Sequence, residues 1–163
     1  TADIVVTNGQ ILSDPVRDIL KMVVVNRYYN APVSVAFVKN FGLKGGAIAS
    51  SVAHDSHNII AVGEEDEAIA GAINLVIKGQ GGISCISRAG ANYLPLPVAG
   101  LMSTADGYKV AEAYTRLDRM AKGLGCTLSS PFMTLSFMAL LVIPHLKLSD
   151  LGLFDGDSFQ FVR

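Results

Sequence analysis

The sequence of 163 residues has no tryptophan, only two cysteines and three histidines, and only 17% charged residues. Its 13 lysines and arginines nearly balance its 14 aspartates and glutamates, so it lacks the basic surplus that attracts a phosphate backbone. We therefore expect no nucleic-acid partner. A typical globular chain carries about 25% charged residues, and the shortfall here indicates that part of the surface is covered by something else.

The two cysteines, Cys85 and Cys126, lie far apart in the sequence and form no C-x-x-C motif. This usage is typical of reduced thiols in a cytoplasmic protein, with a disulfide between them as the less favoured alternative. The N-terminus also lacks the basic and apolar segments of a secretory signal peptide. We therefore expect a cytoplasmic location.

Long hydrophobic runs are absent as well. The most apolar stretch covers residues 132–143, between Pro131 and Pro144, and it is shorter than the roughly 20 residues that a membrane-spanning helix needs. We interpret this stretch as buried core and expect no membrane partner.

What the sequence does contain is a large apolar fraction. Half of the residues are hydrophobic and the mean hydropathy is +0.41, so a chain of this length supports one sizeable core and a single domain. Runs of β-branched and small apolar residues between Gly, Asn and Pro predict strands. The expected strands are 22–25, 33–38, 47–53, 59–62, a hairpin of 83–87 with 93–96, and a last short strand at 159–162.

The clearest helix signal covers residues 68–77. Acidic residues 64–67 precede it and Lys78 with Gly79 closes it, which complements the helix dipole at both ends. Its interior is apolar around most of the circumference, so we expect this helix to be packed on more than one side.

Two further helices are predicted. One fits residues 106–124, with Ser103 or Thr104 as its N-cap and a single apolar stripe. The other begins at Pro131, after Ser130, and runs to residue 141. The expected fold is therefore α+β, a mixed or antiparallel β-sheet packed with about three helices in a single domain.

The first 18 residues are ambiguous. Residues 4–7 suit a short strand and Asn8 with Gly9 suits a turn. We interpret residues 1–18 as an N-terminal linker or stray strand, and residues 19–163 as the domain.

The densest polar cluster in an apolar neighbourhood lies between two predicted strands, where scaffolds often present functional groups. An imidazole beside a carboxylate suits general acid–base chemistry, and two histidines three residues apart suit a shared metal ion. Turn hydrogen bonds alone would also explain these residue types. The candidates to face a substrate or an active site are His54, Asp55, Ser56, His57 and Asn58.

A metal site built from this chain alone is the less favoured interpretation of the cluster. The remaining histidine, His145, is isolated before a Leu-Lys-Leu run, and the zinc signature H-E-x-x-H is absent. We therefore expect neither a metal ligand set nor a resident cofactor in this chain.

Four ordered segments resemble the C-terminal domain of bacterial adenine deaminase. Residues 37–60, FVKNFGLKGGAIASSVAHDSHNII, resemble the signature run of that family. Residues 94–103, 131–137 and 143–148 follow in the family's order. The resemblance covers residues 19–163.

One loop departs from the family pattern. The family has a histidine-containing, glycine-bearing loop where this chain has residues 27–32, with Tyr28 and no glycine. A role for this loop at the mouth of a substrate site is therefore not carried over.

The resemblance implies a parent enzyme of the amidohydrolase superfamily that converts adenine and water to hypoxanthine and ammonia in purine salvage. In that family the metals, manganese or iron, lie in a (β/α)₈ barrel that precedes this domain. Such a barrel needs roughly 250 residues, so we expect the present chain to be inactive alone and to pack on the barrel of the same enzyme. The resemblance also implies a homo-oligomer.

Two alternatives remain open. The chain would be an independent purine-binding or assembly module without catalysis if it binds its ligand without a barrel. It would be a self-sufficient metal hydrolase if His54, Asp55 and His57 held a metal ion.

Overall fold

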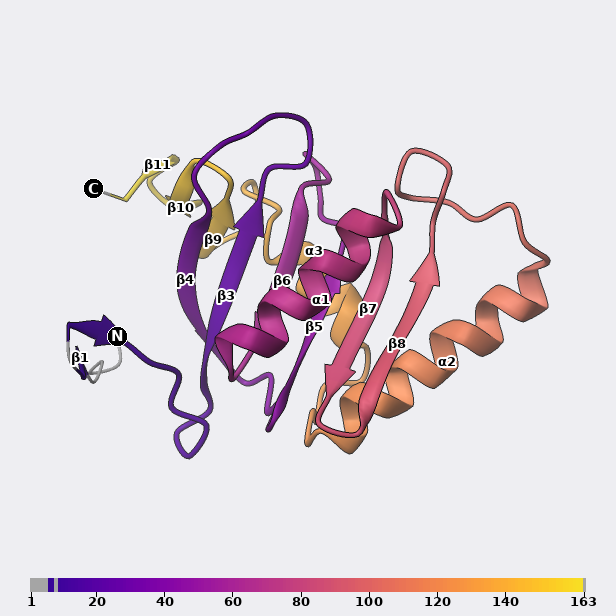
Figure 1. Cartoon of the computed structure of the whole chain (residues 1–163). Helices are drawn as coiled ribbons and strands as arrows, with labels where there is room; N and C mark the ends of the chain where they lie inside the picture. The colour runs from indigo at the N-terminus through magenta and orange to yellow at the C-terminus, as the bar shows by residue number, and fades with distance from the viewer. Residues whose placement is uncertain (1–5, 8, 163) are drawn as a thin grey trace.

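A six-stranded antiparallel sheet forms the centre of the structure, a computed structural model that describes residues 6, 7 and 9–162 (Figure 1). It confirms the expected α+β class, and every strand pairing within this sheet is antiparallel. In spatial order the strands are β4 (Ser34–Lys39), β3 (Ile19–Val25), β6 (Ile59–Gly63), β5 (Gly46–Ser50), β7 (Gly82–Ser87) and β8 (Gly90–Pro95).

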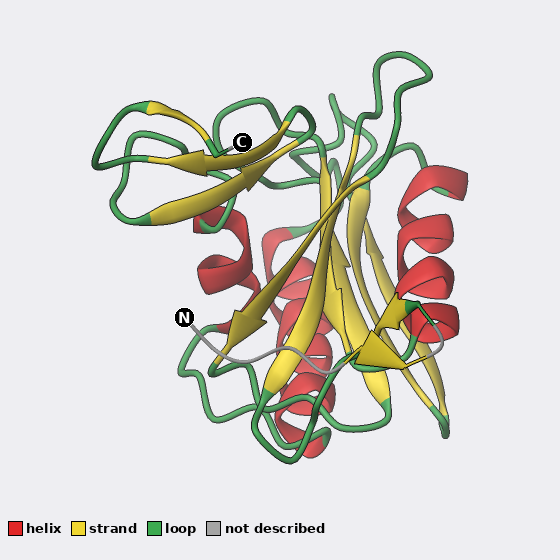
Figure 2. Ribbon diagram, turned by 90° about the vertical axis from the view of Figure 1, so that its left-hand side faces the viewer, coloured by secondary structure: helices red, strands yellow, loops and turns green. Residues whose placement is uncertain are grey.

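The helices cover the two faces of this sheet unequally. Helix α1 (Asp66–Lys78) packs on one face, whereas α2 (Gly107–Gly123) and α3 (Pro131–Phe137) pack on the other (Figure 2). Successive side chains of a strand point to opposite faces, so Ala47 and Ala49 of β5 contact the α1 side and Ile48 contacts the α2 and α3 side. The sheet is therefore the middle of three layers.

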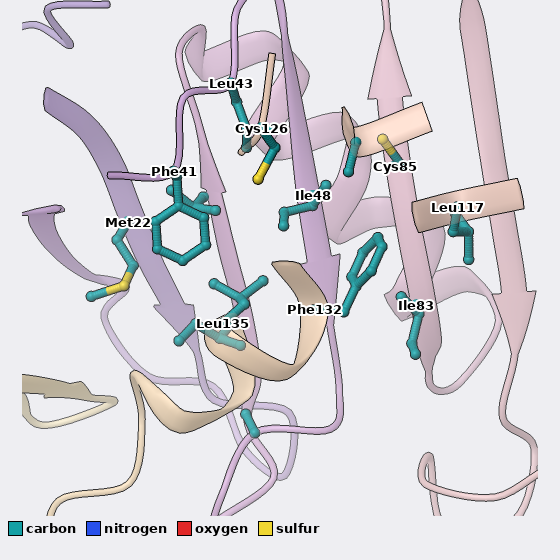
Figure 3. Close-up of a cluster of buried hydrophobic side chains, with 14 of the residues drawn as sticks. Met22, Phe41, Leu43, Ile48, Ile83, Cys85, Leu117, Cys126, Phe132 and Leu135 are labelled. Atoms are coloured by element: carbon teal, nitrogen blue, oxygen red, sulfur yellow. The ribbon is translucent and has the colours of Figure 1, made fainter. Parts of the chain in front are cut away.

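The larger core lies between the sheet, α2 and α3 (Figure 3). Leu117 of α2 and Leu135 of α3 are 1% and 0% exposed, and full burial of such a side chain contributes about 1.5–3 kcal/mol. Both cysteines lie in this core as free thiols. Burial raises the pKa of Cys85 to about 12, so its thiol stays protonated at neutral pH.

Two small sheets flank the central one. Strands β9 (Leu146–Ser149), β10 (Gly152–Asp155) and β11 (Gln160–Phe161) form a three-stranded sheet whose first two strands contact β4. Strands β1 (Val6–Thr7) and β2 (Gln10–Ile11) form a short hairpin. The predicted strand at residues 4–7 and the turn at Asn8 lie partly outside the described residues.

The structure corrects three details of the helix predictions. Helix α1 buries only one face, with Ile69, Ala72, Ile73 and Val76, so two-sided packing is wrong for this chain by itself. Asp106, and neither Ser103 nor Thr104, caps α2, because its carboxylate accepts the N–H groups of Tyr108 and Lys109.

The third helix ends at Phe137 and does not reach residue 141. The carbonyl of Met138 accepts the N–H of Leu148, 3.1 Å away, so the chain leaves the helix to meet β9 before Pro144 would have stopped it. In the part of the chain that the structure describes, no helix has the length and apolarity to cross a membrane.

Candidate functional site

Four connections gather at one end of the central sheet. Because the strands are antiparallel and in register, the ends of β3, β5 and β8 lie beside the starts of β6 and β7. This brings together residues 26–33, 51–58, 79–81 and 96–106, which are far apart in the sequence. The predicted cluster at residues 54–58 is one of these connections.

Backbone hydrogen bonds hold residues 54–58 in place. The N–H of His57 donates to the carbonyl of Ala53 at 2.7 Å, and the N–H of His54 donates to the carbonyl of Ser136 at 3.1 Å. His57 has a φ of 53°, in the left-handed region that β-carbon-bearing residues seldom adopt. These hydrogen bonds fix the loop as a turn, and the bond from His54 to Ser136 attaches it to α3.

The structure brings the two histidines together and adds an aromatic partner. The ring centroids of His54 and His57 are 5.5 Å apart with an interplanar angle of 69°. The ring centroid of His54 is also 5.1 Å from that of Phe137. Phe137 is 39% exposed at the end of α3, so it adds an accessible apolar ring to the candidate site.

The other three candidates divide into exposed and structural residues. Asp55 and Ser56 are exposed, whereas Asn58 is only 2% exposed. The side-chain oxygen of Asn58 accepts the N–H of Arg27 at 3.2 Å, and the carbonyl of Ser56 accepts the Tyr28 hydroxyl at 2.7 Å. Asn58 therefore positions the neighbouring connection, and the loop that departs from the family pattern lies directly against residues 54–58.

Arg27 joins a third connection to the site. Its Nη2 donates to the carbonyl of Ala99 at 2.6 Å, and its guanidinium lies 5.0 Å from the centre of the Tyr28 ring. A Cβ at Gly100, which has a φ of +74°, would lie 2.0 Å from Nη1 of Arg27. The guanidinium is the end of a flexible side chain and would move away from such a Cβ, so it is the positive φ of Gly100 that favours glycine at this position.

The surroundings of His57 favour its neutral form. Burial lowers the pKa of His57 below its ordinary value, and electrostatic interactions with His54 and Arg27 lower it further, against a weaker opposing effect of Asp55. Among the described residues, nothing hydrogen-bonds to the buried Nδ1 of His57 or to the buried Nε of Arg27. Both atoms are buried, so a group from outside these residues would reach either of them only if the neighbouring connections moved.

The described residues do not fit a catalytic metal ion. Residues 6, 7 and 9–162 contain no group of three or more His, Cys, Asp or Glu side chains that could hold one. The hydrolase alternative built on His54, Asp55 and His57 therefore has no ligand geometry to support it.

The arrangement suits recognition more than a complete reaction. Neutral His57 and the Arg27 guanidinium offer hydrogen bonds, and the rings of His54 and Phe137 offer apolar faces of the kind that a planar heterocycle stacks on. Arg27 and Phe137 were not among the candidates from the sequence. Both occur in segments that the family comparison already drew on, but only the folded chain shows that they meet residues 54–58.

Known proteins match nearly the whole chain. The family described as the adenine deaminase C-terminal domain matches residues 1–160. An adenine deaminase of Methanosarcina barkeri is 60% identical over 158 residues, which are 97% of this chain and 29% of that protein. Adenine deaminases of Methanosarcina acetivorans and Salinibacter ruber are 58% and 57% identical, over 97% and 95% of this chain. The chain spans 29% of the length of each of these two relatives.

Proposed function

The chain belongs to the adenine deaminase C-terminal domain family, and from that membership we propose that it serves an enzyme that hydrolyses adenine to hypoxanthine and ammonia. The observation that carries this proposal is the similarity to adenine deaminases, 60% identity over 97% of the chain for one of them. Because the chain covers only 29% of that relative, the catalytic machinery is assigned to the longer part that precedes it.

The partner that we propose is the metal-bearing amidohydrolase barrel of the same polypeptide. Manganese or iron in that barrel would activate the attacking water. The described residues of the present chain contain no fitting ligand set, so no step of the reaction is assigned to a metal ion here. We further propose that the full-length enzyme is a homo-oligomer and that residues 1–18 link the two parts.

The role that we propose for residues 54–58 is to face the active site of the barrel. The unpaired Nδ1 of His57 supports this role, since a buried polar atom without a partner is costly and a small movement of residues 54–58 against the barrel would give it one. His54 and Phe137 would line the same surface with aromatic rings. Asn58 would act as a positioning residue through its hydrogen bond to Arg27.

A cytoplasmic location is part of the proposal. It is supported by the two free, buried thiols Cys85 and Cys126, which are typical of a reducing compartment.

Calorimetric titration of the 163-residue chain with adenine tests whether recognition needs the barrel. We expect no heat of binding and no shift in Tm, because residues 54–58 supply only one side of a site whose remainder lies in the preceding part. Saturable heat with a matching rise in Tm would contradict this and favour the independent purine-binding module. Cytosine, titrated under the same conditions, controls for nonspecific heat.

A further inference from the structure

An apolar trough runs between α1 and strand β4. It arises because α1 packs over β5, β6 and β7 and leaves β4, at the edge of the sheet beyond β3, uncovered on the same face (Figure 1). Its volume is about 450 Å³. Its apolar lining comes from both walls and includes Val25, Val33, Val35, Ile69, Ile73 and Ile77.

The β4 wall of the trough is apolar although it is exposed to solvent. Val35 pairs with Val23 of β3, whose side chain contacts the α1 core, so Val35 points to the α1 side. Val33 and Val35 are 53% and 51% exposed, although an open strand face is normally polar. Ala36 and Val38, on the opposite face, pack on the covered core.

The α1 wall shows the same anomaly. Ile69 and Ile73 are buried towards the sheet, but Ile77 in the last turn is 51% exposed. Ile77 extends the apolar surface of α1 beyond the face that packs on the sheet. The described residues cover only that one face. A partner seated in the trough would cover the second.

The trough leads to the candidate functional site. A second cavity of about 350 Å³ shares Val25 and Ile77 with the trough and also contains Arg27. A third, of about 370 Å³, shares Arg27 with the second and contains Tyr28. One body seated along this path would therefore contact both the trough and the residues beside His57.

We propose that the preceding part of the same polypeptide docks in this trough. The proposal rests on the proposed function, because it takes that part to be the catalytic barrel. The three relatives described above are more than three times as long as the present chain, and in this family the additional length lies ahead of the C-terminal domain.

The path of the N-terminal segment favours the preceding part of the polypeptide, rather than a second copy of the chain, as the partner in the trough. Ser13 accepts the N–H of Lys21 at 3.1 Å, and Lys21 is itself a lining residue of the trough. Strands β1 and β2, which precede Ser13, lie on the α1 side of the sheet (Figure 2). A part joined to the chain through this N-terminal segment is tethered and so has a raised effective concentration at the trough, whereas a second copy is not tethered.

Hydroxyl-radical footprinting of the full-length enzyme and of the 163-residue chain tests the proposal. We expect Val33, Val35 and Ile77 to be labelled at least about fivefold more slowly in the full-length enzyme, since the core of an interface excludes water. Tyr108, which is 89% exposed at the start of α2, serves as the reference residue. Equal labelling in the two samples would overturn the proposal, and so would protection of the 163-residue chain that grows with its concentration, which indicates a second copy.

A charged residue in the trough provides the second readout. We expect Val35→Glu in the full-length enzyme to speed proteolysis between residues 12 and 18 at least about tenfold by undocking the two parts, while the Tm of the 163-residue chain stays within about 2 °C. Val142→Glu, at a valine that is 61% exposed and outside the trough, is the matched control. Equal effects of the two variants would contradict docking in the trough.

Different results would overturn the proposed function and the docking proposal. Adenine turnover by the 163-residue chain would end the proposed function and leave a protected trough standing. Unprotected valines in an enzyme whose isolated C-terminal chain is inactive would end only the docking proposal.

Discussion

His57→Ala in the full-length enzyme is expected to lower kcat/KM for adenine about 10- to 100-fold, which corresponds to about 1.4–2.7 kcal/mol of transition-state stabilisation. The reason is the buried Nδ1 of His57, which the described residues leave unpaired and which we assign to the active-site side. Because no side-chain hydrogen bond within the described residues is lost, the free energy of unfolding should fall by only about 1 kcal/mol or less. Steady-state kinetics and thermal unfolding of the same preparations measure both effects.

Two further variants make this result decisive. His57→Asn keeps a residue that tolerates the left-handed backbone, at a φ of 53°, and is expected to show the same kinetic loss. His145→Ala removes a histidine that is 83% exposed and bonded to Asp157, and should leave kcat/KM within about twofold. Parallel losses of Tm and activity in the His57 variants would show that the residue only maintains the turn.

Gly81→Ala is expected to destabilise the 163-residue chain by about 3 kcal/mol or more, from steric overlap and from strain at a left-handed φ. Gly81 has a φ of +125°, and a Cβ there would lie 2.2 Å from the Cα of Gly100. The neighbouring atoms are backbone, so no side-chain rotation relieves the overlap. Denaturant unfolding followed by circular dichroism measures the loss.

The surroundings of Gly81 explain why the overlap cannot relax. The Ser51 hydroxyl accepts the N–H of Gly82 at 2.8 Å and donates to the carbonyl of Gly100 at 2.5 Å, which fixes both backbones. The Tyr93 hydroxyl donates to the carbonyl of Gly81. The same contacts hold the connection at residues 96–106 against Arg27, so this packing also shapes the candidate site.

Gly90→Ala is the matched control for this prediction. Gly90 also has a positive φ, of +146°, but a Cβ there would meet nothing within 4 Å. It should therefore cost only the backbone strain, about 1–2 kcal/mol. Similar losses at the two glycines would contradict the role given to the contact between Gly81 and Gly100.

Local sequence patterns predicted most of the helices and strands, because these elements depend mainly on residues that are close together in the sequence. The charges around residues 68–77 predicted α1 within two residues of Asp66–Lys78, and Gly79 ends it as expected. Runs of β-branched residues predicted all six strands of the central sheet. These signals depend on the residue's own side chain and its near neighbours, so a single sequence contains them.

The strand order and the site depend on contacts that are distant in sequence. Strand β5 lies between β6 and β7, an order that no spacing in the sequence indicates. The sequence does not predict β9, because the alternation of Leu146 and Leu148 is too short to distinguish from a loop. The cluster at residues 54–58 was evident from its composition, but its partners Arg27 and Phe137 arrive from β3 and α3 and are recognised only in the folded chain.

The most direct test of the central claim is adenine turnover by the purified 163-residue chain supplied with manganese or iron, beside the full-length enzyme at equal concentration. The account predicts hypoxanthine and ammonia from the full-length enzyme and none above the buffer rate from the 163-residue chain, because its described residues contain no fitting set of metal ligands. Metal-dependent turnover by the 163-residue chain alone would contradict the account.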